Sequence, residues 1–199
     1  MPSNPNLPGQ ADGGAFPVRT DLSRLQQFKH RVSLSHAQLG IPPDYEHSCG
    51  LTLCLEPEEL VDTELDFYQR PQKLVAAALR SWASMRAAAA ANGVSLFLIS
   101  AFRSVEYQHQ LIAAKLEKGQ LIEQILRVNA APGFSEHHSG RALDIGTSGC
   151  DALVEEFENT DAFQWLMENS ATYYFYLSYP RNHASSIGYE PWHWCFQQG

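Results

Sequence analysis

The sequence predicts an α+β domain in which helices pack around a small antiparallel sheet. An alanine-rich run at residues 72–92 indicates a helix, and short apolar runs at 94–100, 142–145 and 189–196 indicate strands. Hydrophobic residues make up 44% of the 199 residues and charged residues 18%, which is enough apolar surface for a globular core. We therefore expect one compact domain.

The first third of the chain has the weakest pattern. Residues 1–20 are rich in proline and glycine, so we expect a flexible lead-in, followed by a single domain over residues 21–199. Between Leu22 and Phe67, short apolar groups alternate with prolines and acidic residues. This pattern favours loops with one or two short strands.

The central elements are better defined. Strong helix formers fill residues 72–92, and apolar residues recur at helical spacing from Leu74 to Met85. The Asn92-Gly93 pair then supplies a left-handed stop. The run VSLFLIS that follows is typical of a buried strand, and its end delivers the segment SAFR.

The second half alternates the same two patterns. Helical composition returns over residues 105–126, the turn-rich NAAPGFS interrupts it, and ALDI follows as a short strand. A further helix is expected at 151–174, with Phe157, Trp165 and Leu166 in the core. The chain then forms a strand at YFYLSY and a final strand at YEPWHWCF, which we place at the centre of the sheet.

The charge balance excludes several classes of partner. The formal net charge is −8 at pH 7, so the chain offers no basic stripe for nucleic acid and no attraction to an anionic membrane. No run is long and apolar enough for a transmembrane segment, and the first residues lack the features of a secretory signal. We expect neither a nucleic acid nor a membrane span.

The cysteines and most histidines show no metal-site spacing. The four cysteines include no CxxC pair, and we expect small buried hydrophobes more than disulfides at Cys49, Cys54, Cys150 and Cys195. Five histidines are expected to be hydrogen-bonded structural residues, namely His30, His36, His47, His109 and His183.

Potential metal ligands concentrate in the segment SEHHSGRALD. A catalytic zinc site uses three protein ligands, commonly histidine nitrogens and carboxylate oxygens, and keeps one position open for water. Gly140 allows a sharp turn, so His137 and Asp144 can converge on one ion. His138 is expected to point elsewhere, because the side chains of sequence neighbours diverge.

The second such segment is EPWH. Glu190 and His193 are three residues apart and would face opposite sides of a regular strand. A bend at Pro191 is therefore part of the prediction, because it would turn both side chains toward one site.

These motifs resemble those of the LAS metallopeptidases (lysostaphin, D-Ala-D-Ala peptidase, hedgehog), and among them the VanY-type D-alanyl-D-alanine carboxypeptidases. SEHHSGRALD fits the pattern SxHxxGxAxD, YEPWH fits ExWH, and SAFRSVEYQ is similar to S-[AG]-[YF]-R-S-x-x-x-Q. The likeness covers residues 72–196 and keeps the family's motif order. It implies a hedgehog/D,D-peptidase-like fold whose small antiparallel sheet bears a zinc site.

The resemblance also implies a function, a zinc-dependent carboxypeptidase that hydrolyses the terminal D-alanine of peptidoglycan stem peptides by D,D- or L,D-cleavage. It implies one Zn²⁺ per chain and the following roles: metal binding by His137, Asp144 and His193, general base catalysis by Glu190, transition-state stabilisation by Arg103, and substrate contacts from Gln108 and Ser135. The expected partners are stem peptides or their precursors, bound by a bacterial monomer. Its expected location is the periplasm or cell envelope if a signal peptide has been removed, and the cytoplasm otherwise.

The chemistry of these residue types agrees with those roles. Zinc lowers the pKa of its water to about 7, a carboxylate can take the proton, and a guanidinium can hold developing oxyanion charge. Glu190 has an alternative role in orienting a ligand histidine, and Arg103 one in pairing with an acidic residue. The departures from the family pattern remove no ligand and bear on pocket shape; they lie at Tyr174, Ser178, Cys195 and Phe196.

Two other functions stay open. One is a peptidoglycan endopeptidase that cuts L-Ala-D-Glu, a class whose signature tends to carry aspartate at the Glu190 position and which normally comes with a wall-binding module. The other is a non-catalytic, hedgehog-like zinc-bearing binding module. The intact Glu190 and Arg103 argue against the binding module.

Overall fold

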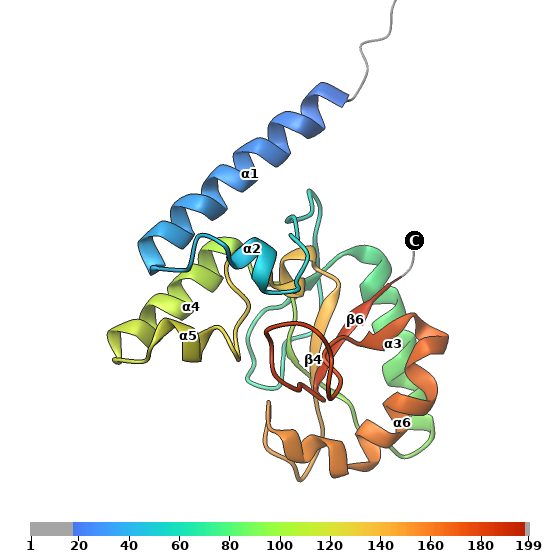
Figure 1. Ribbon diagram of the computed structural model, residues 1–199. Helices are drawn as coiled ribbons and strands as arrows, with labels where there is room; N and C mark the ends of the chain where they lie inside the picture. The colour runs from blue at the N-terminus through green and yellow to red at the C-terminus, as the bar shows by residue number, and fades with distance from the viewer. Residues whose placement is uncertain (1–17, 198–199) are drawn as a thin grey trace, which may run out of the picture.

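The computed structural model describes residues 18–197 and shows a four-stranded sheet flanked by helices (Figure 1). Along the chain the elements are α1 Val18–Leu39, α2 Tyr45–Ser48, β1 Val61–Asp62, β2 Lys73–Leu74, α3 Ala76–Ala91, β3 Phe97–Ser100, α4 Val105–Glu117, α5 Ile122–Ile125, the 3-10 helix η1 Glu136–Ser139, β4 Ala142–Gly146, the 3-10 helix η2 Glu155–Asn159, α6 Asp161–Asn169, the 3-10 helix η3 Ser170–Tyr173, β5 Phe175–Leu177 and β6 His193–Phe196.

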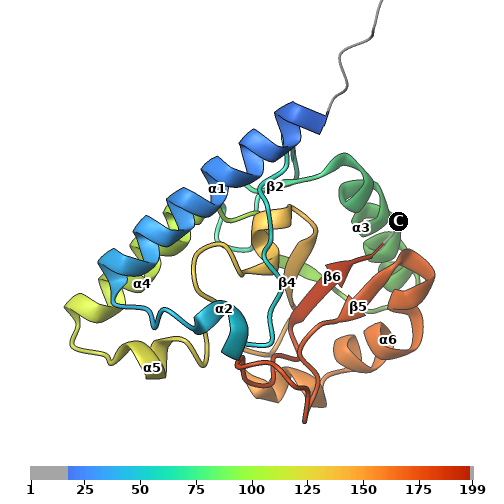
Figure 2. The same ribbon diagram turned by 45° about the horizontal axis from the view of Figure 1, so that its top comes forward.

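The main sheet is antiparallel throughout, with the strand order β3-β4-β6-β5. Strands β1 and β2 form a separate antiparallel pair. Helices α3 and α6 lie together beside the sheet, while α1 and α4 lie on the other flank of the molecule (Figure 2). The predicted α+β class is confirmed, and the last strand, β6, lies at the centre of the sheet as expected.

The two central strands have two different faces. Leu143 of β4 and Trp194 of β6 belong to the apolar core that α3 and α6 cover. Because successive side chains of a strand point to opposite faces, the neighbouring Asp144 and His193 face away from that core. The period of two therefore separates the hydrophobic core from the polar site.

A second apolar cluster joins α1 to α4 and α5, and it corrects the expectation of loops over residues 22–67. Helix α1 takes up Val18–Leu39, and it buries Phe28, Val32, Ser35 and Leu39 at helical spacing. Ser35 Oγ also lies 2.8 Å from His109 Nδ1 on α4. This apolar stripe is narrow and includes a serine, so the polar composition around it concealed the helix.

The segment before residue 72 also supports the loop that leads to the site. His36 Nε2 donates to the carbonyl of Pro132 at 2.8 Å. The Tyr45 hydroxyl accepts from the backbone N–H of Ala131 at 3.1 Å. The lead-in expected for residues 1–20 falls mostly on residues 1–17, which lie outside the described part of the chain.

Three predicted helices have different bounds from those expected. The helix placed at 72–92 begins at Ala76, because Lys73 and Leu74 pair with β1 instead. The helix placed at 105–126 is divided after Glu117, where Gly119 takes φ +80°. These boundaries depend on strand pairing and on a glycine that composition alone does not place.

The region 151–174 is likewise not one helix. Thr160 accepts a hydrogen bond from the N–H of Phe163 at 3.2 Å and so starts α6 afresh after the 3-10 helix η2. Tyr174 then takes φ +59° and ends η3. The predicted core residues of this region are nevertheless buried: Phe157, Trp165 and Leu166.

All four cysteines are free thiols, and two of them, Cys49 and Cys195, are buried as expected for small hydrophobes. Over residues 18–197, no helix combines the length and apolar character that a membrane crossing requires.

Candidate metal centre and active site

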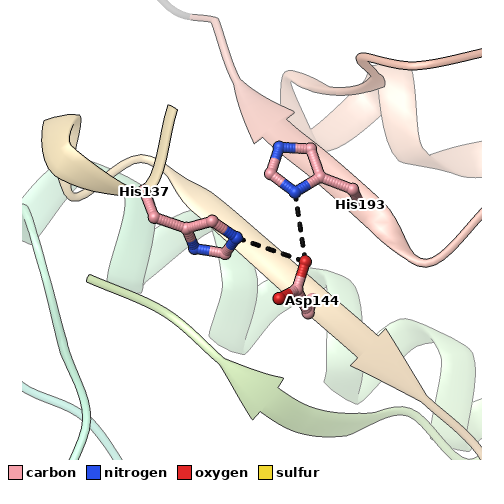
Figure 3. Close-up of side chains that lie close together, drawn as sticks. All are labelled: His137, Asp144 and His193. Carbon is pink, nitrogen blue, oxygen red and sulfur yellow. Dashed lines mark hydrogen bonds and ion pairs between the residues drawn. The ribbon is translucent and has the colours of Figure 1, made fainter. Parts of the chain in front are cut away.

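Three side chains converge on the polar face of β4 and β6 (Figure 3). Asp144 Oδ1 lies 3.2 Å from His137 Nε2 and 3.1 Å from His193 Nδ1. One ligand atom from each residue lies within 4.8 Å of the others, and all three residues are buried. Nitrogen, nitrogen and carboxylate oxygen at this separation form a donor set that could hold a metal ion.

Strand register places two of the three. Asp144 is directly paired with His193 across the β4–β6 ladder, so their side chains emerge side by side. Asp144 is also paired with Ser100 of β3, next to an irregularity in the β3–β4 register after Leu98. The site thus lies where the central strands meet the end of β3.

His137 arrives from the short helix η1, and Gly140 returns the chain to β4. Gly140 takes φ +64°, and a Cβ atom there would lie 2.7 Å from Leu60 Cδ2 and 3.3 Å from the backbone nitrogen of Val75. Glycine is therefore required both by the left-handed conformation and by the close approach of Leu60 and Val75. The sharp turn expected at this position is present.

Neighbouring groups fix the orientation of both histidines. His137 Nδ1 donates to the carbonyl of Ala101 at 2.6 Å, which leaves Nε2 toward Asp144. His193 Nε2 lies 3.0 Å from Glu136 Oε2, which leaves Nδ1 toward Asp144. Hydrogen bonds of this kind to the remote ring nitrogen are the usual support of metal-binding histidines, so the residues fit a metal ion.

The electrostatics also favour positive charge at this position. Burial and the nearby Arg103 lower the pKa of His137 to about 4. Burial opposes ionisation of His193, but the carboxylates of Asp144 and Glu136 raise its pKa to about 10. Although burial disfavours its charge, the contacts to both histidines hold the pKa of Asp144 far below its usual range. Nearby positive charge stabilises a buried carboxylate such as that of Asp144. A bound divalent cation would supply that charge.

Glu190 reaches the same site through a turn. The N–H of His193 donates to the carbonyl of Glu190 at 3.1 Å, so the chain bends at Pro191 as predicted. Glu190 Oε2 then lies 3.9 Å from His193 Nδ1. Burial raises the pKa of Glu190 to about 7, against the opposing charge of His193. A carboxyl group with this pKa can exchange protons near neutral pH.

Arg103 lies at the end of the segment that follows β3. Its backbone N–H donates to His137 O at 3.3 Å, and its guanidinium Nη2 lies 3.9 Å from Asp144 Oδ2. Its buried Nε has no hydrogen-bond partner in the described part of the chain. His138 lies outside the metal-ligand set: its Nδ1 donates to Arg103 O at 2.6 Å and its Nε2 accepts from Gly133 N at 3.0 Å. His138 thus holds the backbone of Arg103.

A small cavity of about 30 Å³ opens beside these groups. Gln108 and Ser135 line it together with His137 and Glu190. Gln108 is 1% exposed and donates from Nε2 to the carbonyl of Ala130 at 2.8 Å, while its Oε1 has no partner among the described residues. The structure therefore places Gln108 and Ser135 where they can contact a small bound group.

A wider cavity of about 450 Å³ shares Arg103 and Glu190 with the small one and reaches Asp144. Asp144 is thus accessible from a space large enough for several residues of a peptide. The arrangement comprises a buried donor set for a metal, a carboxyl group of near-neutral pKa, a guanidinium, and two cavities of different size that meet there.

Comparison with known proteins identifies the family. A family model described as VanY, D-alanyl-D-alanine carboxypeptidase, matches residues 71–199. The chain belongs to the VanY family. Among curated proteins, it is 30% identical over 180 residues to YodJ of Bacillus subtilis, which is named a carboxypeptidase. It is 34% identical over 106 residues to a D-alanyl-D-alanine carboxypeptidase of Enterococcus faecium.

The match to YodJ covers 86% of this VanY-family chain and 62% of the relative. The match to the Enterococcus faecium protein covers 51% of the chain and 30% of the relative. The chain therefore spans less than two thirds of the length of either protein.

Solved structures give the same fold. The LdcB LD-carboxypeptidase is 29% identical with a TM-score of 0.64, over 71% of this chain and 69% of that chain. A mutant VanY D,D-pentapeptidase from a VanB-type resistance cassette, solved in complex with Zn(II), is 25% identical with a TM-score of 0.52, over 72% and 85% of the two chains.

The sequence motifs did not reveal every residue at this VanY-family site. The motifs predict no role for Glu136, which contacts His193 across 57 positions of the chain. Its only signal in the sequence is its position next to His137. His138 was expected to point away, and it does, but its two hydrogen bonds to the Arg103 and Gly133 backbones were not foreseen.

Proposed function

We propose that the protein is a zinc-dependent carboxypeptidase that removes the terminal D-alanine of peptidoglycan stem peptides. The single observation that carries this proposal is the convergence of the His137, Asp144 and His193 donor set with Glu190 and Arg103 in a VanY-family chain. His137 Nε2, Asp144 Oδ1 and His193 Nδ1 would hold one zinc ion. When bound, zinc supplies Lewis acidity that activates water and polarises a carbonyl.

The side chains supply the remaining chemistry. Glu190, with a pKa of about 7, takes a proton from the attacking water and later delivers it to the amine of the departing D-alanine. Arg103 has an unpartnered Nε and lies beside Asp144, so its guanidinium can hold the oxygen on which negative charge develops. Ala101 and Glu136 hold the two histidines in the required tautomers.

The sizes of the two cavities support cleavage at a chain end. The space of about 30 Å³ lined by Gln108 and Ser135 can hold only a small group such as the methyl of D-alanine, whereas the rest of the peptide needs the wider cavity. The proposal includes both D,D- and L,D-cleavage, because both specificities occur among the solved relatives. All of the proposed ligands come from one chain, so the site does not require a residue from a second copy.

Mass spectrometry of muropeptides tests the proposal. The zinc-loaded protein is incubated with purified tetrapeptide and pentapeptide muropeptides, and Glu190→Gln serves as the matched inactive variant. Loss of one alanine from the pentapeptide indicates D,D-cleavage, and loss of one alanine from the tetrapeptide indicates L,D-cleavage. Release of a peptide cut after L-alanine would instead support the endopeptidase. Binding without any product would support the hedgehog-like module.

A further inference from the structure

Two basic side chains line the wide cavity beside the site. Lys115 lies in the last turn of α4, and Arg127 follows α5. Both line the cavity of about 450 Å³ that also contains Asp144 and Glu190. The last turn of α4 and the segment after α5 thus bring two positive charges to the space from which a peptide reaches the site.

Neither charge is neutralised by the protein. Over the described part of the chain, Lys115 and Arg127 form no ion pair and no side-chain hydrogen bond. The chain has 22 acidic and only 14 basic residues, so acidic partners are in excess. Two unpaired cations thus line one cavity, with Lys115 half-buried and Arg127 exposed.

Another cavity that Arg103 lines provides a contrast. It has a volume of about 430 Å³ and is lined by Arg70 and Lys73. Arg70 pairs with Asp66 at 2.7 Å, and Lys73 pairs with Asp62 at 2.6 Å. Cations next to the site are thus not left unpaired in general.

The unpaired state has an energetic cost that a ligand would remove. Lys115 is half-buried, and burial together with the charges of Arg103 and Lys118 lowers its pKa. An anionic group bound beside Lys115 would offset both this desolvation and the repulsion from Arg103 and Lys118, and the exposed Arg127 lines the same cavity. Glu155 also lines this cavity, but it pairs with Arg181 at 3.3 Å.

The cavity sizes indicate which part of the substrate carries that anion. The small cavity beside Gln108 and Ser135 can hold only a small group such as the methyl of the departing D-alanine, so the wide cavity takes the residues that precede the cleaved bond. We propose that Lys115 and Arg127 form a subsite for a free carboxylate on the acyl side of that bond. This inference rests on the proposed function and adds a substrate preference to it.

A stem peptide offers this carboxylate from two sources. One is the α-carboxylate of a D-glutamate that is linked through its side chain, and the other is the distal carboxylate of meso-diaminopimelate. Four synthetic peptides ending in D-alanine, compared in two pairs, separate these sources. The first pair contains lysine, and its members carry either D-glutamate or the α-amide of D-glutamate. In the second pair the glutamate is amidated in both members, which carry either diaminopimelate or its distal amide. Release of D-alanine is measured as kcat/KM for each.

Three variants complete the test. Lys115→Met and Arg127→Met remove one charge each, and Arg80→Met is the matched control, because Arg80 is exposed on α3 and does not line the cavity. We expect the wild-type protein and Arg80→Met to favour the acid over the amide by roughly 10-fold in one of the two pairs, as for a charge-assisted hydrogen bond. Lys115→Met and Arg127→Met should reduce that ratio toward one by slowing only the acid. The pair that responds identifies the carboxylate.

The outcomes are separable. If the wild-type protein releases D-alanine from acid and amide at equal rates in both pairs, the subsite is refuted and the proposed function stands. If Lys115→Met slows acid and amide alike, its ammonium serves the terminal carboxylate or the fold, and the inference is wrong. If no peptide loses D-alanine, the proposed function fails and the inference fails with it.

Discussion

Replacement of Gly140 by alanine tests whether the turn between His137 and Asp144 requires glycine for two separate physical reasons. The first is conformational, because φ is +64°. The second is steric, because a Cβ atom would lie 2.7 Å from Leu60 Cδ2 and 3.3 Å from the nitrogen of Val75. Gly149→Ala isolates the first reason, since Gly149 has φ +78° and nothing lies within 4 Å of its Cβ position.

The two costs can be estimated separately. The left-handed conformation costs an alanine about 1 kcal/mol, which is the whole effect expected for Gly149→Ala. Gly140→Ala adds overpacking of roughly 1–3 kcal/mol, because Leu60 can move but the backbone of Val75 cannot. The expected total is about 2–4 kcal/mol, a large part of the 5–15 kcal/mol that is typical of a domain.

Urea unfolding of the metal-free protein measures these differences, with equal m-values as the check that the unfolded state is unchanged. In a Leu60→Ala background, Gly140→Ala should cost less than in the wild type, because the closest steric contact is gone. Equal destabilisation by Gly140→Ala and Gly149→Ala would show that the close approach of Leu60 and Val75 is not what requires the glycine.

Four further outcomes are expected. His137→Ala should abolish stoichiometric zinc binding by metal analysis, and a full equivalent of bound zinc would remove His137 from the ligand set. Glu190→Gln should lower kcat by roughly 10² or more while zinc content stays near one per chain, and near-normal turnover would place the base elsewhere. Arg103→Lys should lose most of the roughly 10²-fold contribution that Arg103 makes to kcat, because an ammonium lacks the planar fork of a guanidinium. A lower melting temperature with unchanged kcat would instead show that Arg103 has a structural role. Asp66 is 1% exposed and accepts hydrogen bonds from Arg70. Asp66→Asn should therefore lower the free energy of unfolding by about 1.5–3 kcal/mol at pH 7. The control Asp62→Asn, at an exposed ion pair, should lower it by only about 0–1 kcal/mol. Burial alone would raise the pKa of Asp66, but these hydrogen bonds hold that pKa below 3.8. The stabilisation is therefore present above about pH 3.9 and is lost as the pH falls through the folded-state pKa. A destabilisation by Asp66→Asn that is independent of pH would refute the charge-based explanation.

Much of the site could be predicted because its parts are local in sequence. His137, Gly140 and Asp144 lie within eight residues, and a glycine turn between a histidine and a strand has few geometric solutions. The alternation of Asp144 with Leu143 likewise fixes which face of β4 is polar. Residue type and spacing therefore predict which residues form the donor set, although its role in binding metal stays a prediction.

The parts that could not be predicted depend on contacts between distant segments. Glu136 meets His193 only through the pairing of β4 with β6, and nothing in the sequence near Glu136 encodes that contact. Helix α1 was hidden for a related reason, since its buried stripe faces α4 and the loop before η1. Lys115 and Arg127 belong to no recognisable motif. Only the cavity that they line shows that they lie near the site.

The direct pairing of Asp144 with His193 has a consequence for folding. The two residues are 49 positions apart, so this contact forms only after a long loop closes, and such non-local pairings are slow to form. A shift of one residue in the ladder would turn one of the two side chains toward the apolar core. The donor set is therefore assembled only when β4 and β6 meet in the native register, and a metal ion that binds to it would stabilise that register over every slipped alternative.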